Sequence, residues 1–254
     1  MRRAMFLSAL LAAGCRFGVA GLPIRGADDG GGIPDLAVAP GDAATATPLD
    51  LAAAADLAAP LDLAVPPDLA TPPSLSGQLV TVGTAIALTT EGTLDWAHWG
   101  LAAAGDFDHR ALGGTRISDF TRIGTTATVF RYANDPRSYT WADGTPTAAA
   151  TATPTGIYVP AATAGVRITA ACDGSARTLR VYLTGWQSSA VLSARISDGS
   201  RTYTDQNAGS MSADYRPVYE LVYRCGPPLD LEVSWSVNQN YGSSNVGIAA
   251  ATLQ

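Results

Sequence analysis

Beyond residue 78, short segments of alternating apolar and polar residues follow one another, and no helical stripe interrupts them. Alternation with a period of two puts apolar side chains on one face of a β-strand, whereas an amphipathic helix needs a period near 3.6. In one such segment, Leu179, Val181 and Leu183 predict the inward face of a strand. Arg180 and Tyr182, between them, are then expected to point outward.

Similar segments recur every 8–12 residues or so and are separated by turn signals such as Asp198-Gly199 and Asn240-Tyr241-Gly242. The candidate strands are 79–88, 117–123, 126–132, 156–159, 165–172, 178–185, 190–197, 201–205, 217–224, 230–237 and 246–253. Many short strands at this spacing predict an all-β sandwich or barrel. The length of the segment suits a jelly-roll β-sandwich over residues 77–254.

Residues 26–76 have a different composition. The tripeptide Asp-Leu-Ala recurs there, four times with a strict six-residue period, and eight prolines interrupt the segment. A period of six fits neither a helical nor a pleated face, and the prolines would break a helix repeatedly. Residues 16–76 are therefore expected to form a disordered spacer rich in Ala, Asp and Pro. Residues 17–76 hold eight Asp and one Arg, a charge of −7, so this segment accounts for the net charge of −6 of the chain.

The N-terminus has the features of an export signal. Arg2 and Arg3 precede an apolar run over residues 4–13, which is too short to span a bilayer. The following residues 11–15, Leu-Ala-Ala-Gly-Cys, resemble a bacterial lipobox, although Ala12 stands where Leu is most usual. The resemblance implies a lipoprotein with a signal peptide over residues 1–15, a lipid on Cys15, and anchorage in the cell envelope, at the outer membrane. The alternative is an ordinary signal peptide cleaved after Ala20, which would give a soluble periplasmic or secreted protein.

The mature protein keeps Cys172 and Cys225 under either interpretation of the N-terminus. Each follows an expected strand and precedes a turn. Because an exported protein meets oxidising conditions, we expect these two residues to form a disulfide. Two buried thiols are the alternative.

Several short motifs resemble, in order, a domain that recurs in secreted bacterial proteins. They are the segment 89–100 with Asp-Trp-Ala-His-Trp at 95–99, and the segments 143–147, 155–159, 177–182 and 197–200. The layout of that domain is similar to galactose-binding-like and carbohydrate-binding-module jelly rolls. The resemblance implies a non-catalytic module that recognises a glycan or a surface polymer, although a fold does not by itself define a function.

The candidate ligand-binding residues are aromatic or lie beside aromatic residues, because a sugar site needs an aromatic plate with hydrogen-bonding groups around it. Trp96, His98 and Trp99 form the densest group, and a core role for these residues is the alternative. Trp141 and Trp186 lie next to a turn and at a strand end, and are expected to be exposed. Trp235 shares a face with Leu231 and Val233 and is expected in the core. Asp106 and Asp108 are weak candidates for a calcium site, with a solvated loop as the alternative.

Composition argues against several other functions. No Lys is present, and two His and three Cys are too few for an ordinary zinc cluster. The acidic balance argues against nucleic-acid binding. Glu91, Glu220 and Glu232 are the only Glu residues, and no Gly-x-Ser-x-Gly motif occurs, so neither a glycosidase nor a serine hydrolase is favoured. We therefore expect a monomeric binding module without catalytic residues or cofactor. A structural or protein-interaction role in the envelope is the alternative, and a hydrolase is a remote one.

Overall fold

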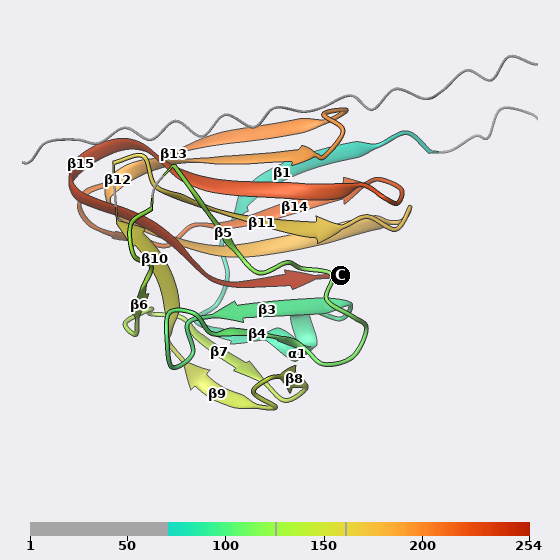
Figure 1. The fold of residues 1–254 in the computed structure, drawn as a ribbon, viewed down its shortest axis with the longest axis horizontal. Coiled ribbons are helices and arrows are strands. Elements are labelled where there is room, and N and C mark those ends of the chain that lie inside the picture. The colour runs from blue at the N-terminus through green and yellow to red at the C-terminus, as the bar shows by residue number, and fades with distance from the viewer. Residues whose placement is uncertain (1–70, 125, 161) are drawn as a thin grey trace, which may run out of the picture. The chain divides into compact units, whose positions relative to one another are not determined.

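The structure of the protein is a computed structural model that describes residues 71–254, apart from residues 125 and 161 (Figure 1). The expected signal peptide, Cys15 and nearly all of the expected spacer lie outside the described residues. The first strand begins at Ser74, three residues before the expected start of the domain. Within the described part of the chain, no helix is both long enough and apolar enough to cross a membrane.

The described residues form fifteen strands and one helical turn. The first strands and the helix are β1 (Ser74–Val80), β2 (Ala85–Ala87), α1 (Leu88–Glu91), β3 (Asp95–Trp99), β4 (Phe107–Arg110), β5 (Thr121–Ile123), β6 (Phe130–Tyr132) and β7 (Ser138–Trp141). The later strands are β8 (Gly144–Thr145), β9 (Ala150–Thr153), β10 (Gly156–Pro160), β11 (Gly165–Ala171), β12 (Ala176–Ile196), β13 (Thr202–Tyr215), β14 (Val218–Arg224) and β15 (Asp230–Leu253).

Two long strands, β12 and β15, organise the fold. They pair antiparallel from Leu179 opposite Leu253 to Ile196 opposite Leu231, with register shifts near the middle. The separate strands predicted at 178–185 and 190–197 are thus one strand, as are those at 230–237 and 246–253. The turn signal at residues 240–242 does not end β15, although pairing with β12 passes from Asn245 directly to Asn240 and the N–H of Gly242 donates to Oδ1 of Asn240 at 2.8 Å.

One half of each long strand lies in one layer of the sandwich, and the other half lies in the other layer. The first half of β12 pairs with β14, which pairs with β1, and its second half pairs with β13. Apolar residues of both halves, such as Val181 and Leu192, belong to one buried core. The two layers also meet directly, since Trp235 donates through Nε1 to the carbonyl oxygen of Thr184 at 2.9 Å. The expected all-β jelly-roll β-sandwich is confirmed.

A disulfide joins the two layers at one end. Cys172 directly follows β11 and Cys225 directly follows β14, and the two residues are bonded with their Cα atoms 5.2 Å apart. The predicted Cys172–Cys225 pairing is confirmed.

A third layer, which the sequence did not predict, covers part of the outer face. The strands β2, β7 and β9 form a separate small sheet, which lies beyond β3 and β4 from the long strands (Figure 1). Together with Leu88 of α1, this sheet buries a second apolar core that contains Trp96, Tyr139, Trp141 and Tyr182. Tyr182 does point away from the main core as expected, but the third layer buries it completely.

Candidate functional site

Most of the aromatic residues that the sequence singled out lie in the two cores. Trp96, Trp99 and Trp141 are at most 2% exposed, and His98 is fully buried. The reason is that β3 is covered on both faces: Trp99 contributes to the main core and Trp96 to the second one. The prediction that Trp141 is exposed is wrong, and none of these four side chains offers a free ring face to a sugar. Trp235 is in the core, as predicted.

The polar atoms of these buried rings serve the fold. The indole N–H groups of Trp96, Trp99 and Trp141 each donate at 2.9 Å, to Asp143, to Asp119 and to the carbonyl oxygen of Thr147. The His98 ring lies near the rings of Trp141 and Tyr139, and its Nε2 is 3.4 Å from the Thr155 hydroxyl. Burial lowers the pKa of His98 to about 4, so the ring is neutral at physiological pH.

The carboxylates next to β3 and β4 also have structural partners. Asp95 accepts the backbone N–H groups of Arg116 and Ile117, and burial raises its pKa. Asp106 accepts N–H groups from its own loop, and Asp108 accepts the N–H of Thr147 at 2.9 Å. Among the described residues, no group of three metal-binding side chains occurs. Asp106 and Asp108 thus hold loops together.

Trp186 is the only predicted aromatic site residue with an intermediate exposure. It lies on β12 at the point where the strand bends, and Gln187 beside it has a positive φ of 44°. Trp186 is in register with Asp214 of β13 on one side and with Asn245 of β15 on the other. Directly opposed residues point to the same face of a sheet. Trp186, Asp214 and Asn245 therefore lie on the same face of the sheet. This face is polar, and the third layer does not cover it.

A pocket of about 240 Å³ opens on this face, and we call it the Tyr158 pocket. Its lining residues come from β6, β10, β12, β13, β15 and two loops, and they are Tyr132, Asn134, Tyr158, Thr184, Asp214, Arg216 and Asn245. Gly247 lies between Thr184 and Tyr158 in the ladder. A Cβ atom at position 247 would stand 1.9 Å from the carbonyl oxygen of Ile157, so only glycine allows β10 and β15 to approach this closely.

Arg216 is held rigidly at the base of the pocket. Its guanidinium donates to the carboxylate of Asp214 at 2.8 Å and to the hydroxyl of Thr184, and it lies 5.0 Å from the centre of the Tyr132 ring. The Tyr132 hydroxyl donates to the buried carboxylate of Asp135 at 3.2 Å. Burial raises the pKa of Tyr132 far above its usual value, so this hydroxyl stays protonated.

Two stacked aromatic rings adjoin the pocket. Phe130 and Tyr158 are paired across β6 and β10, and their ring centres are 5.5 Å apart with an angle of 22° between the planes. Phe130 is 44% exposed. Neither residue is among the candidates predicted from the sequence, which are four Trp residues and His98. The alternation in residues 156–159 puts the Tyr158 side chain on the other face of the strand from Ile157. This pattern could have identified Tyr158 as an outward-facing aromatic residue.

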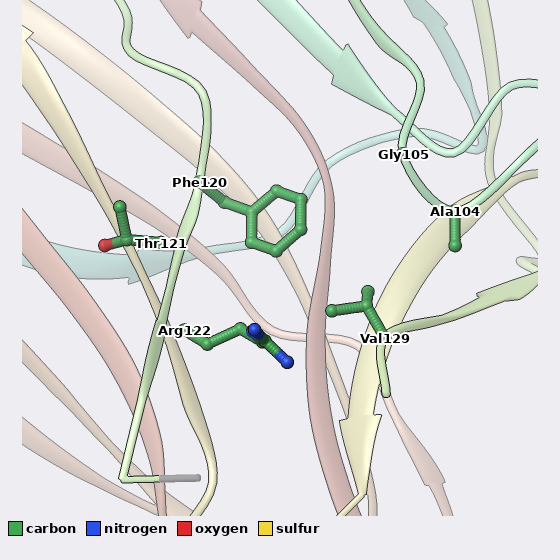
Figure 2. A pocket seen from close by; sticks show the side chains of 6 residues that line it. All are labelled: Ala104, Gly105, Phe120, Thr121, Arg122 and Val129. Atoms are coloured by element: carbon green, nitrogen blue, oxygen red, sulfur yellow. The ribbon is translucent and has the colours of Figure 1, made fainter. Parts of the chain in front are cut away.

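A larger and more open pocket lies elsewhere on the domain (Figure 2). Figure 2 shows Phe120, Val129 and the guanidinium of Arg122 pointing into a common space, while Thr121 points away. Arg122 already donates to the carbonyl oxygens of Thr126 and Ala127. Part of the only charged group of this pocket of about 610 Å³, among the described residues, is thus engaged by its own loop.

No protein-family model matches the sequence, and no curated protein matches it. Three solved structures show distant structural similarity. TmCBM61 in complex with β-1,4-galactotriose has 10% identity and a TM-score of 0.35 over 54% of this chain and 88% of that one. The family 11 carbohydrate-binding module of a cellulosomal cellulase from Clostridium thermocellum has 11% identity and a TM-score of 0.25 over 56% of this chain and 89% of that one.

The enzymatically active domain of a tailspike protein from bacteriophage CBA120 has 16% identity and a TM-score of 0.29. That match covers 55% of this chain but 20% of the tailspike chain. Likenesses at these TM-scores do not define the function of the present chain, which has to be inferred from its own residues.

Proposed function

We propose that the domain is a non-catalytic glycan-binding module and that its ligand binds in the Tyr158 pocket. The observation that carries the proposal is the combination of an accessible aromatic pair, Phe130 and Tyr158, with fixed polar groups beside it. A sugar ring has an apolar face that packs on an aromatic ring and hydroxyl groups that need donors and acceptors at its edge. Asn134 and Asn245 supply both kinds of group.

The charges in the pocket favour a neutral sugar. Among the described lining residues, Asp214 carries a negative charge and Arg216 a positive one, and the two form an ion pair at 2.8 Å. The pair leaves little net charge for an anionic or cationic ligand, but its remaining lone pairs and N–H groups can bind hydroxyls. A volume of about 240 Å³ is below the roughly 300–1,000 Å³ of sites for drug-sized ligands, which suits one end of a glycan or a small part of it.

The same residues argue against hydrolysis. Glycoside hydrolysis generally needs two carboxyl groups on either side of the scissile bond. Among the described residues, Asp214 is the only carboxylate that lines the Tyr158 pocket, and it is paired with Arg216. A hydrolase would also cleave the glycan that it binds. We therefore expect that no product is released from a bound glycan.

A glycan array probed with the purified protein tests this function. We expect binding to neutral glycans, and a loss of about 3- to 10-fold in affinity in Phe130→Ala, since one aromatic contact of this kind is removed. Leu112→Ala is the matched control, because Leu112 is also an exposed apolar residue (73%) and lies outside the pocket. Equal affinities of the two variants would contradict the proposed site, and release of products from the bound glycan would favour a hydrolase.

A structural or protein-interaction role in the envelope is the second candidate. The burial of Trp96, Trp99, Trp141 and Trp235 favours it, since a module that uses tryptophan platforms would keep some of these rings accessible. An array without any binding, together with capture of a single envelope protein by the wild type and by Phe130→Ala alike, would support this role.

We further propose that the protein is exported and anchored to the envelope by a lipid on Cys15, as a monomer. The lipobox-like residues 11–15 and the oxidised Cys172–Cys225 pair support export. The intact mass of the mature protein tests lipidation, and an unmodified N-terminus at Gly21 would contradict it. Light scattering of the purified protein tests the monomeric state.

A further inference from the structure

A second cavity, of about 360 Å³, lies beside the Tyr158 pocket, and we call it the Arg137 cavity. Its walls are formed mainly by apolar residues at the end of β1 and the start of β14, and two guanidinium groups complete the lining. The apolar walls include Val80, Val82 and Val218. The two cations are Arg137 and Arg216, of which Arg216 also lines the Tyr158 pocket.

Arg137 is buried but incompletely bonded. Its side chain is 6% exposed. Its Nε and Nη2 donate to the carboxylate of Asp135 at 3.0 and 3.1 Å, and Nη2 also donates to the carbonyl oxygen of Leu183. Nη1 is buried and has no hydrogen-bond partner among the described residues. The Arg137 guanidinium carbon lies 5.7 Å from the centre of the Tyr182 ring, but no described oxygen accepts from Nη1, which is rare for a buried guanidinium N–H.

Each of the two cations has a carboxylate partner, but neither carboxylate lines the cavity. Asp135 is fully buried: it binds Arg137 directly, and its Oδ1 is 3.9 Å from Nε of Arg216. Asp214, which pairs with Arg216 at 2.8 Å, is partly exposed and lines the Tyr158 pocket, not this cavity. Among the described residues, the lining of the Arg137 cavity therefore contains two guanidinium groups and no carboxylate.

We propose that the Arg137 cavity binds the carboxylate group of a small ligand. A carboxylate has planar acceptor oxygens that match guanidinium N–H groups. It would accept from Nη1 of Arg137, while the rest of the ligand packs against Val80, Val82 and Val218. This site is independent of the glycan site, because it uses Arg137 and the apolar edge of β1, which the Tyr158 pocket does not include.

Titration of the isotope-labelled protein with butyrate, followed by NMR of the methyl groups of Val82 and Val218, tests the proposal. We expect saturable shifts with butyrate and none with the neutral analogue butanamide. Galacturonate and galactose form a second pair of probes. They show whether the carboxylate that binds belongs to an apolar molecule or to an acidic sugar. Binding should weaken as the salt concentration rises, because the attraction is electrostatic.

Two kinds of variant assign the effect to the cavity. Arg137→Gln should abolish the shifts, but it could also disturb the fold. Thr81→Glu is therefore the second variant, since Thr81 is exposed and lies at the edge of the cavity. A negative charge there should weaken butyrate binding by about threefold through repulsion, whereas the matched neutral Thr81→Gln should not. Absence of saturable shifts, identical shifts with butanamide, or equal affinities of the two Thr81 variants would overturn the proposal.

Discussion

His98 lies in the second core with its neutral ring against Tyr139 and Trp141. Burial lowers its pKa from 6.5 to about 4, so between these two pH values the unfolded chain binds a proton that the folded protein does not bind. The contribution of His98 to stability is therefore complete above pH 6.5 and is lost as the pH falls toward 4. At about 1.4 kcal/mol per pKa unit, the loss amounts to roughly 3 kcal/mol.

Urea unfolding at pH 7 and pH 4.5, in the wild type and in His98→Gln, tests this prediction. We expect the wild type to lose more stability than the variant over this interval, because the variant has no ring to protonate. Asp95 acts in the opposite direction, since its raised pKa favours the folded state as the pH falls, but this effect is common to both proteins. The same pH dependence in both proteins would contradict the assignment to His98.

Asp135 holds two guanidinium groups and two tyrosine hydroxyls below the surface. We expect Asp135→Asn to cost about 3 kcal/mol of unfolding free energy, because it leaves the buried Arg137 without its anion. Glu232→Gln is the matched control: it breaks a surface ion pair with Arg195, which is 51% exposed, and should cost less than about 1 kcal/mol. Similar losses in both variants, measured by urea unfolding, would be incompatible with a buried role for Asp135.

At the level of single residues, the sequence could not show which aromatic rings are exposed. Trp141 lies next to a turn signal and Trp186 at the end of a predicted strand, yet Trp141 is packed against Trp96 and Trp186 is partly exposed. Exposure depends on what lies opposite a strand, and the residues that cover Trp141 come from distant segments of the chain. Cys172 and Cys225 were predictable, because two thiols in an exported domain leave a single possible pairing.

At the level of elements, the alternation of residues identified the strands but not their lengths. The patterns at 178–185 and 190–197 were correct, and the polar residues between them suggested a break. In the structure, Ser188 and Ser189 remain paired with Asn240 and Gln239, and a strand whose backbone hydrogen bonds are satisfied on its neighbour does not have to end at polar residues. Because β12 and β15 bend at this point, both strands take part in both layers.

The disulfide joins elements of the two layers and closes a loop with a sequence separation of 53. The chain-entropy relation predicts a stabilisation of about 4 kcal/mol for a loop of this length. We therefore expect the double variant Cys172→Ser, Cys225→Ser to lose roughly this amount in urea unfolding, with little change in the folded secondary structure. A variant as stable as the wild type would show that the bridge adds no net stability.

At the level of the whole molecule, the sequence predicted two layers, and the structure has three. The small sheet of β2, β7 and β9 is built from strands of three or four residues, too short for a clear alternation, and β2 pairs in parallel with β7. This layer determines which side chains the outer face exposes, because it buries Trp96 and His98 and leaves the Tyr158 pocket open beside it. The residues predicted as a site are therefore covered, and a pocket that was not predicted lies next to them.

An NMR titration of the labelled protein with a panel of neutral oligosaccharides tests glycan binding at this face most directly. The predicted result is saturable shifts for at least one oligosaccharide, concentrated on the amides of Tyr158, Asp214 and Asn245, which line the pocket. Absence of saturable shifts with every member of the panel, or shifts confined to the surface around Phe120 and Val129, would contradict it.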